Sequence, residues 1–236
     1  PGCCYKPRKR KCIPVFKKIT GDAVLRIYTM RTILDKIVEA KKEALQLVKK
    51  TAGLSDFKES LYWKRTCVSL KQRLLAKEST GIIAEFKRKS PSKGWFKNEA
   101  DSVDEIVLAY EKYGAAGISV LTDEQFFGGS LADLKTARSL VDIPLLRKDF
   151  MIDEWQIAEA KALGADVILL IAGCLSPAQV NSMAAFAKEL GMEVLLEIHS
   201  EAELIHICQQ VDMVGVNNRD LKNFEVSVDV SLRLIH

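Results

Sequence analysis

The sequence predicts an α/β protein built on parallel strands, and favours a (β/α)8 barrel preceded by helices over a doubly wound open sheet. From residue 81 onward, short apolar runs alternate strictly with helical patterns, which is typical of parallel βα units. Charged residues occur late in several of these runs, and a barrel gathers the carboxyl ends of its strands around one mouth. A doubly wound sheet usually binds its ligand at a glycine-rich turn, and no GxGxxG sequence occurs.

Residues 1–29 form a basic segment that differs from the rest of the chain. They hold eight lysines and arginines against one acid, Asp22, although the whole chain has a net charge of only +4. Residues 30–236 are therefore net negative, which removes the support for a nucleic-acid partner. We expect residues 1–29 to be a disordered or non-native extension ahead of a natural start at Met30, with a targeting peptide as the alternative.

Residues 30–80 are predicted to form a helical extension in front of the barrel. The segment MRTILDKIVEAKKEALQLVKK carries apolar residues at helical spacing. These residues are Ile33, Leu34, Ile37, Val38, Leu45 and Val48. A second, shorter stretch with the same spacing predicts another helix over 66–77.

Six βα units follow over residues 81–236. The predicted strands are 81–87, 117–122, 144–150, 166–171, 193–198 and 213–217. The predicted helices are 102–113, 130–140, 153–163, 176–190, 200–210 and one that starts near 226. Since a full barrel takes about 250 residues, we expect units 1–6 of an incomplete (β/α)8 barrel, without the last two units.

Several classes of protein are disfavoured by the composition. No apolar run reaches the ~18–20 residues of a membrane span, and the N-terminus lacks the pattern of a secretory signal. The six cysteines form no CxxC pair and the three histidines no ligand cluster, so we predict no metal site. A cytoplasmic protein without a membrane partner is the expectation.

Six polar residues at strand ends are predicted to converge on the mouth of the barrel. They are Glu85, Lys87, Lys148, Glu197, Asn217 and Arg219. Strand alternation places Glu85 and Lys87 on one face and Arg88 on the other. Charges inside strands cost several kcal/mol unless they are paired, so such a set indicates a functional site, while a structural ion pair is the alternative for each residue alone.

The residue types at the mouth suit acid–base chemistry on an anionic substrate that carries a carbonyl group. A partly desolvated lysine beside another cation can donate a proton near neutral pH, and a Schiff base at Lys148 is also possible. Glutamates can take a proton or stabilise a developing cation. Arg219 can grip a carboxylate with two hydrogen bonds.

Three further features have both a structural and a functional interpretation. Phe127, followed by two glycines after the second strand, is either part of a packed loop or a platform for an aromatic ring. Trp95 and Phe96 could form a lid over the mouth. We interpret His199, two residues after Glu197, as the start of a loop rather than a catalyst.

Six motifs in order give the sequence a family resemblance that covers residue 30 to the C-terminus. They are IIAEFKRKSPSKG, SVLTDEQFFGGS, LLRKDF, ADVILLIA, VLLEIH and VGVNNRDL. In sequence and spacing they resemble indole-3-glycerol phosphate synthases. The resemblance implies a TIM barrel with a helical N-terminal extension, acting in tryptophan biosynthesis. It implies ring closure of 1-(2-carboxyphenylamino)-1-deoxyribulose 5-phosphate, with decarboxylation and dehydration, and no metal or organic cofactor.

The resemblance also implies roles for four catalytic residues. Lys148 matches the general acid that protonates the ketone oxygen. Glu197 matches the carboxylate that acts as a base in dehydration. Glu85 matches a second carboxylate that stabilises the cationic intermediate. Lys87 matches a cation that holds the anionic groups and assists proton transfer.

Five further residues match substrate contacts of the family. Ser90 matches a contact to the phosphate. Asn217 and Arg219 match groups that orient the substrate. Phe127 and Leu169 match apolar contacts to its ring.

The resemblance ends before two segments that contribute to the phosphate site of the family. A Glu-Ser-Gly segment after the seventh strand and a Gly-Ser turn after the eighth do not occur in this sequence. A truncated, non-catalytic relative therefore stays an alternative, as does another phosphate-binding barrel enzyme, either an isomerase or a Schiff-base synthase. For the synthase, and equally for another phosphate-binding enzyme, we expect a small anionic substrate, no nucleic-acid partner, and a monomer or weak homodimer.

Overall fold

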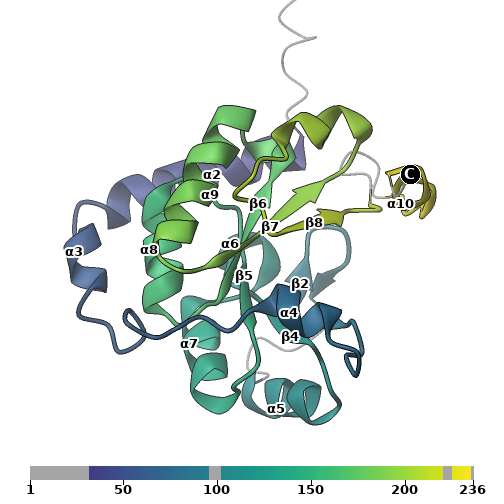
Figure 1. The fold of residues 1–236 in the computed structure, drawn as a ribbon. Coiled ribbons are helices and arrows are strands. Elements are labelled where there is room, and N and C mark those ends of the chain that lie inside the picture. The colour runs from purple at the N-terminus through teal and green to yellow at the C-terminus, as the bar shows by residue number, and fades with distance from the viewer. Residues whose placement is uncertain (1–31, 96–101, 220–224, 235–236) are drawn as a thin grey trace, which may run out of the picture. The chain divides into compact units, whose positions relative to one another are not determined.

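The computed structural model describes residues 32–95, 102–219 and 225–234, and its centre is a six-stranded parallel sheet (Figure 1). The strands lie in the order β1-β4-β5-β6-β7-β8, so that neighbours in the sheet follow one another along the chain. A doubly wound sheet reverses its strand order at a switch point, and this sheet does not. The described strands are thus part of the wall of a (β/α)8 barrel, as the sequence predicts.

All six strands lie within the predicted ranges. They are β1 (Ile83–Phe86), β4 (Gly117–Leu121), β5 (Leu145–Lys148), β6 (Val167–Ile171), β7 (Glu193–Ile198) and β8 (Met213–Val216). Every residue of β4 and β6 is buried, which explains why these strands read as continuous apolar runs. Two short antiparallel strands, β2 (Lys89–Ser90) and β3 (Gly94–Trp95), form a hairpin after β1.

Helices alternate with the strands. The α-helices are α2 (Ile33–Val48), α3 (Leu54–Phe57), α4 (Leu70–Leu75), α5 (Asp104–Lys112), α6 (Glu124–Phe127), α7 (Leu131–Leu140), α8 (Glu154–Ala162), α9 (Pro177–Glu189) and α10 (Asp229–Leu234). Two 3₁₀ helices are η1 (Ala172–Cys174) and η2 (Glu201–His206). None of the helices within the described ranges has the length and apolar character needed to cross a membrane.

Two of the predicted helices differ from those observed. The segment predicted as a helix over 200–210 is the short η2, which ends at His206. There Nδ1 of His206 lies 3.0 Å from the main-chain oxygen of Glu203, and Nε2 lies 3.0 Å from that of Leu175. The helix predicted over 66–77 is shortened to α4. Its first residues are extended because the Val68 N–H donates to the Asp166 carboxylate at 2.7 Å.

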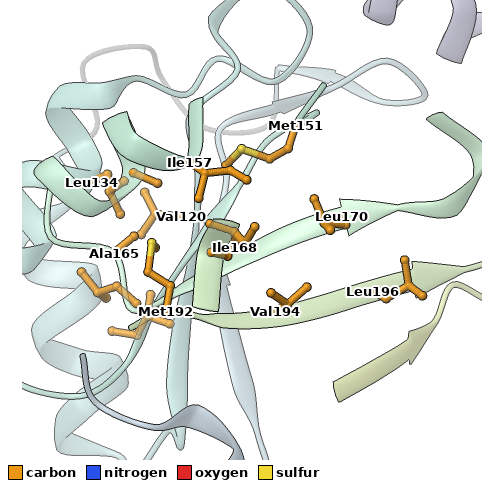
Figure 2. Packing of buried hydrophobic residues seen from close by; sticks show 14 of the residues in the cluster. Val120, Leu134, Met151, Ile157, Ala165, Ile168, Leu170, Met192, Val194 and Leu196 are labelled. Carbon is orange, nitrogen blue, oxygen red and sulfur yellow. The ribbon is translucent and has the colours of Figure 1, made fainter. Parts of the chain in front are cut away.

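The core has two layers, one on each face of the sheet. Strand residues such as Ile168, Leu170 and Val194 belong to one buried cluster with Leu134 of α7 and Ile157 of α8 (Figure 2). The alternate residues face the barrel interior, where Leu70, Leu146, Val167, Leu169 and Ile171 form a smaller cluster. Strand alternation therefore separates an outer core under the helices from an inner core below the mouth.

Helix α2 is anchored to the carboxyl ends of two strands by a buried ion-pair cluster. Thr32 and Asp35 form a capping box that starts this helix. One turn after the buried Ile37, the amine of Lys41 lies 2.7 Å from Asp149 and 3.0 Å from Asp123. These two ion pairs of Lys41 place the predicted helical extension beside the mouth of the barrel.

The domain boundaries at residues 29 and 80 remain predictions. Residues 1–29 and the expected start at Met30 lie outside the described part of the chain.

Candidate active site

A cleft of about 750 Å³ opens at the carboxyl ends of the strands. Eight of the nine residues predicted for the site line it: Glu85, Lys87, Ser90, Phe127, Lys148, Glu197, Asn217 and Arg219. Leu169 does not, because its side chain is buried in the inner core below the cleft. The role of Leu169 therefore stays a prediction of the resemblance.

The end of β1 separates two neighbouring cations by strand alternation. Lys87 faces the cleft and forms an ion pair with Glu85. Arg88 points the other way and is buried, with two guanidinium nitrogens 2.6 and 2.9 Å from the oxygens of Asp133 on α7. Lys87 is thus available to a ligand, whereas Arg88 holds α7 against the sheet.

Lys148 and Glu197 meet across the cleft from the ends of β5 and β7. The amine of Lys148 lies 3.6 Å from Oε2 of Glu197. Asn217, after β8, donates from Nδ2 to Oε1 of the same carboxylate at 2.9 Å, and its Oδ1 accepts from the Arg219 N–H at 3.0 Å. The Glu197 side chain is thereby fixed from one side while Lys148 faces it from the other.

A second charge cluster fixes the backbone next to Lys148. Asp149 is buried, accepts from the Thr122 hydroxyl at 2.7 Å and pairs with Arg147 and Lys41. Burial works against the charge of Asp149, but Arg147 and Lys41 outweigh burial and lower its pKa. Burial likewise opposes the charge of Lys41, and its two aspartates outweigh burial and raise its pKa. The sequence did not indicate this cluster, since its members come from distant segments.

One wall of the cleft is apolar. The rings of Phe127 and Phe150 lie 5.8 Å apart between centroids, and Ile33, Leu34 and Ile37 of α2 line the same cleft. The apolar stripe of α2 is visible in the sequence, but nothing in the sequence assigns it to the site. Together these side chains form a surface suited to an aromatic ring.

The hairpin after β1 adds hydroxyl and cationic groups to the cleft. Ser90, Ser92 and Lys93 all line it. With Lys93, the described lining residues include four cationic side chains against the two carboxylates of Glu85 and Glu197. This charge balance favours an anionic ligand.

Of the two residues of the predicted lid, the structure describes Trp95. Trp95 of β3 is half-exposed and packs near Gly128, where an added Cβ would come within 2.7 Å of its ring. Trp95 is not a lining residue, and Phe96 lies outside the residues that the structure describes, so the lid remains a prediction. In the part of the chain that the structure describes, no group of three or more His, Cys, Asp or Glu side chains could hold a metal ion.

Comparison with known proteins shows the family of the chain. The family model for indole-3-glycerol phosphate synthase matches residues 34–236. The chain belongs to the indole-3-glycerol phosphate synthase family. The match covers the strands that carry Glu85, Lys148 and Glu197, together with almost all of α2.

Curated members of the indole-3-glycerol phosphate synthase family are similar along most of the chain. The protein of that name from Bacteroides thetaiotaomicron is 49% identical over 205 residues, which is 87% of this chain and 78% of the relative. Its namesake from Polaromonas sp. is 44% identical over 210 residues, covering 87% of this chain and 79% of the relative. The one from Carboxydothermus hydrogenoformans is 42% identical over 208 residues, covering 85% and 78%.

Proposed function

We propose that the protein is an indole-3-glycerol phosphate synthase of tryptophan biosynthesis. It converts 1-(2-carboxyphenylamino)-1-deoxyribulose 5-phosphate into indole-3-glycerol phosphate, and carbon dioxide and water leave. The observation that carries the proposal is the approach of Lys148 to Glu197 in the cleft of a chain of this family. This carbon–carbon lyase chemistry needs an acid and a base at one reacting centre, which that pair supplies.

Lys148 is the general acid of the proposed reaction. The aromatic carbon that bears the carboxylate attacks the ketone, and the ketone oxygen takes a proton from the Lys148 ammonium. The Lys148 side chain is 26% exposed, so it is partly removed from water yet open to the cleft. Its position at the end of β5 is fixed by the adjacent Asp149 cluster, which supports a defined direction of proton transfer.

The glutamates act on the intermediate that follows decarboxylation. Glu197 takes the proton from the carbon next to nitrogen as water leaves, and Asn217 holds this carboxylate toward the reacting centre. Glu85 stabilises the cationic intermediate from the end of β1. Lys87, paired with Glu85, holds the anionic groups of the substrate and assists proton transfer.

The remaining lining residues bind and orient the substrate. Ser90 contacts the phosphate, with the neighbouring Lys93 adding positive charge. Asn217 and Arg219 orient the sugar and carboxylate groups. Phe127 and the apolar residues of α2 pack against the ring.

Incubation of the purified protein with 1-(2-carboxyphenylamino)-1-deoxyribulose 5-phosphate tests the proposal. Indole fluorescence and released carbon dioxide are followed together, and we expect them to rise in equal molar amounts. Absence of both products would contradict the synthase assignment. A borohydride-stable adduct on Lys148 would instead support a Schiff-base enzyme.

Two properties predicted from the sequence, the oligomeric state and the location in the cell, do not enter the proposed mechanism. The monomeric or weakly dimeric state and the cytoplasmic location remain predictions. The net negative charge of residues 30–236 supports a small-molecule substrate rather than a nucleic acid.

A further inference from the structure

The proposed reaction consumes a proton. The ketone oxygen leaves as water and so collects two protons, whereas the substrate's carbons release only one as the indole forms. The carboxylate departs as carbon dioxide and contributes none. One proton must therefore enter from water in each turnover, and it must reach the partly buried pair of Lys148 and Glu197.

His199 follows the last residue of β7, and its ring faces the Glu197 carboxylate. Its Nε2 is 3.5 Å from Oε1 of Glu197, and its side chain is 15% exposed. Nε2 is buried and makes no hydrogen bond within the described residues. A buried nitrogen without a hydrogen bond costs free energy of folding. The position of Nε2 so close to Oε1 of Glu197 therefore calls for an explanation.

The other ring nitrogen of His199 faces a second carboxylate. Nδ1 lies 3.5 Å from Oε2 of Glu203, on η2. The same carboxylate accepts from the main-chain N–H of His199 at 2.6 Å, which ties η2 to the end of β7. The Glu203 side chain is 21% exposed and thus within reach of water.

We propose that Glu203 and His199 form a proton relay that carries the proton consumed in each turnover from water to Glu197. This inference rests on the proposed synthase function. It assigns a role to a histidine that the sequence alone favoured as the start of a loop. The imidazole has a carboxylate at each of its nitrogens, with each nitrogen 3.5 Å from one oxygen.

The transfer conserves protons and charge at each step. Glu203 takes a proton from water and gives it to Nδ1 of His199, and the Nε2–H of the resulting imidazolium passes to Glu197. Glu197 then holds a proton 3.6 Å from the amine of Lys148, which it restores to ammonium. The imidazole ends with its proton on Nδ1; after product release, Nε2 takes a proton from water and Nδ1 returns one to water, which restores the first tautomer.

Two other groups beside Glu197 do not carry the proton in the proposed route. Cys174 of η1 is near Glu197 and Glu203, and burial together with these carboxylates raises its pKa to about 12, so the thiol stays protonated near neutral pH. Lys148 and Asp35 also act on this thiol. Asn217 occupies Glu197 from the β8 side and donates only an amide N–H.

Steady-state kinetics of three variants with the synthase substrate test the relay. For His199→Ala we expect kcat to fall by about tenfold or more at unchanged KM, and added imidazole to restore it, since a free imidazole can replace a missing proton carrier. Glu203→Gln keeps an acceptor for the His199 main-chain N–H but cannot pass a proton, and should lower kcat in the same way. Glu201→Gln, an exposed carboxylate on the same helix, is the matched control.

The outcomes separate the relay from the synthase assignment. An unchanged kcat in His199→Ala, or a loss that imidazole does not restore while Glu203→Gln is fully active, would overturn the relay alone. Absence of product from the unmodified protein would overturn both proposals. Thermal unfolding of each variant shows whether a loss of kcat is a loss of fold.

Discussion

The amine of Lys148 and a carboxylate oxygen of Glu197 lie 3.6 Å apart, although their strands are separated in the sheet by β6. Each residue is at or next to the end of its strand, where side chains of a curved parallel sheet converge. Asn217 holds Glu197, and the Asp149 cluster holds the backbone next to Lys148. The acid and the base of the proposed reaction are thus positioned by different elements of the fold.

Glu197→Gln should separate catalysis from binding. The amide oxygen can still accept from Asn217, but the side chain can no longer take a proton. We expect kcat to fall by about 10²–10⁴-fold with little change in KM, as for the loss of a general base. A kcat close to that of the unmodified protein would assign the base to another residue.

Lys41→Met should destabilise the protein, because it leaves Asp123 and Asp149 buried without this cation. Removal of one partner from a buried ion pair costs about 3 kcal/mol in the free energy of unfolding. Urea denaturation of the variant measures this loss. Lys42→Met, at an exposed position of the same helix, should change stability little, and an equal loss in both variants would contradict the role of the cluster.

Asp149 should make stability depend on pH in the acid range. Its pKa is lowered from the usual 3.8, because Arg147 and Lys41 outweigh the effect of burial. A carboxyl with a lower pKa in the folded than in the unfolded chain stabilises the fold above the unfolded value, and this contribution is lost as the pH falls toward the folded value. We expect the free energy of unfolding to drop below about pH 4, and to drop less in Asp149→Asn. Parallel pH curves for the two proteins would refute this assignment.

Asp166 should be among the residues most important for folding. It is fully buried, accepts from the main-chain N–H groups of Leu145 and Val68 at 2.9 and 2.7 Å, and pairs with Arg138 at 3.0 Å. Asp166→Ala leaves these donors and a buried cation unsatisfied, so we expect a loss of about 3–5 kcal/mol in urea denaturation. Glu189→Ala, an exposed carboxylate on α9, serves as the control. A loss below about 1 kcal/mol for Asp166→Ala would show that water replaces its partners.

The sequence predicted the features that depend on local pattern. Apolar runs fixed the six strands, and the late charges in those runs located Glu85, Lys148 and Glu197 at one mouth. The contacts of Lys41 with Asp123 and Asp149 were not predictable, because they depend on how α2 lies against the barrel and leave no periodic signal.

Other features needed the three-dimensional arrangement for similar reasons. Leu169 has the same apolar surroundings in sequence whether it lines the cleft or the inner core below it. His199 gave no signal that its two nitrogens face Glu197 and Glu203, since Glu203 enters only through the turn of η2. The position of this histidine two residues after Glu197 was visible in the sequence, but it was interpreted there as the start of a loop.

Turnover of Lys148→Ala tests the central claim most directly. We expect the variant to lose at least about 10²-fold in kcat for indole-3-glycerol phosphate formation, since it lacks the general acid. Its thermal unfolding should match that of the unmodified protein, because the Lys148 amine is partly exposed and its carboxylate contact is as long as 3.6 Å. Lys135→Ala, at an exposed position on α7, should keep full activity. A Lys148→Ala protein that is folded and still forms product at the unmodified rate would contradict the account.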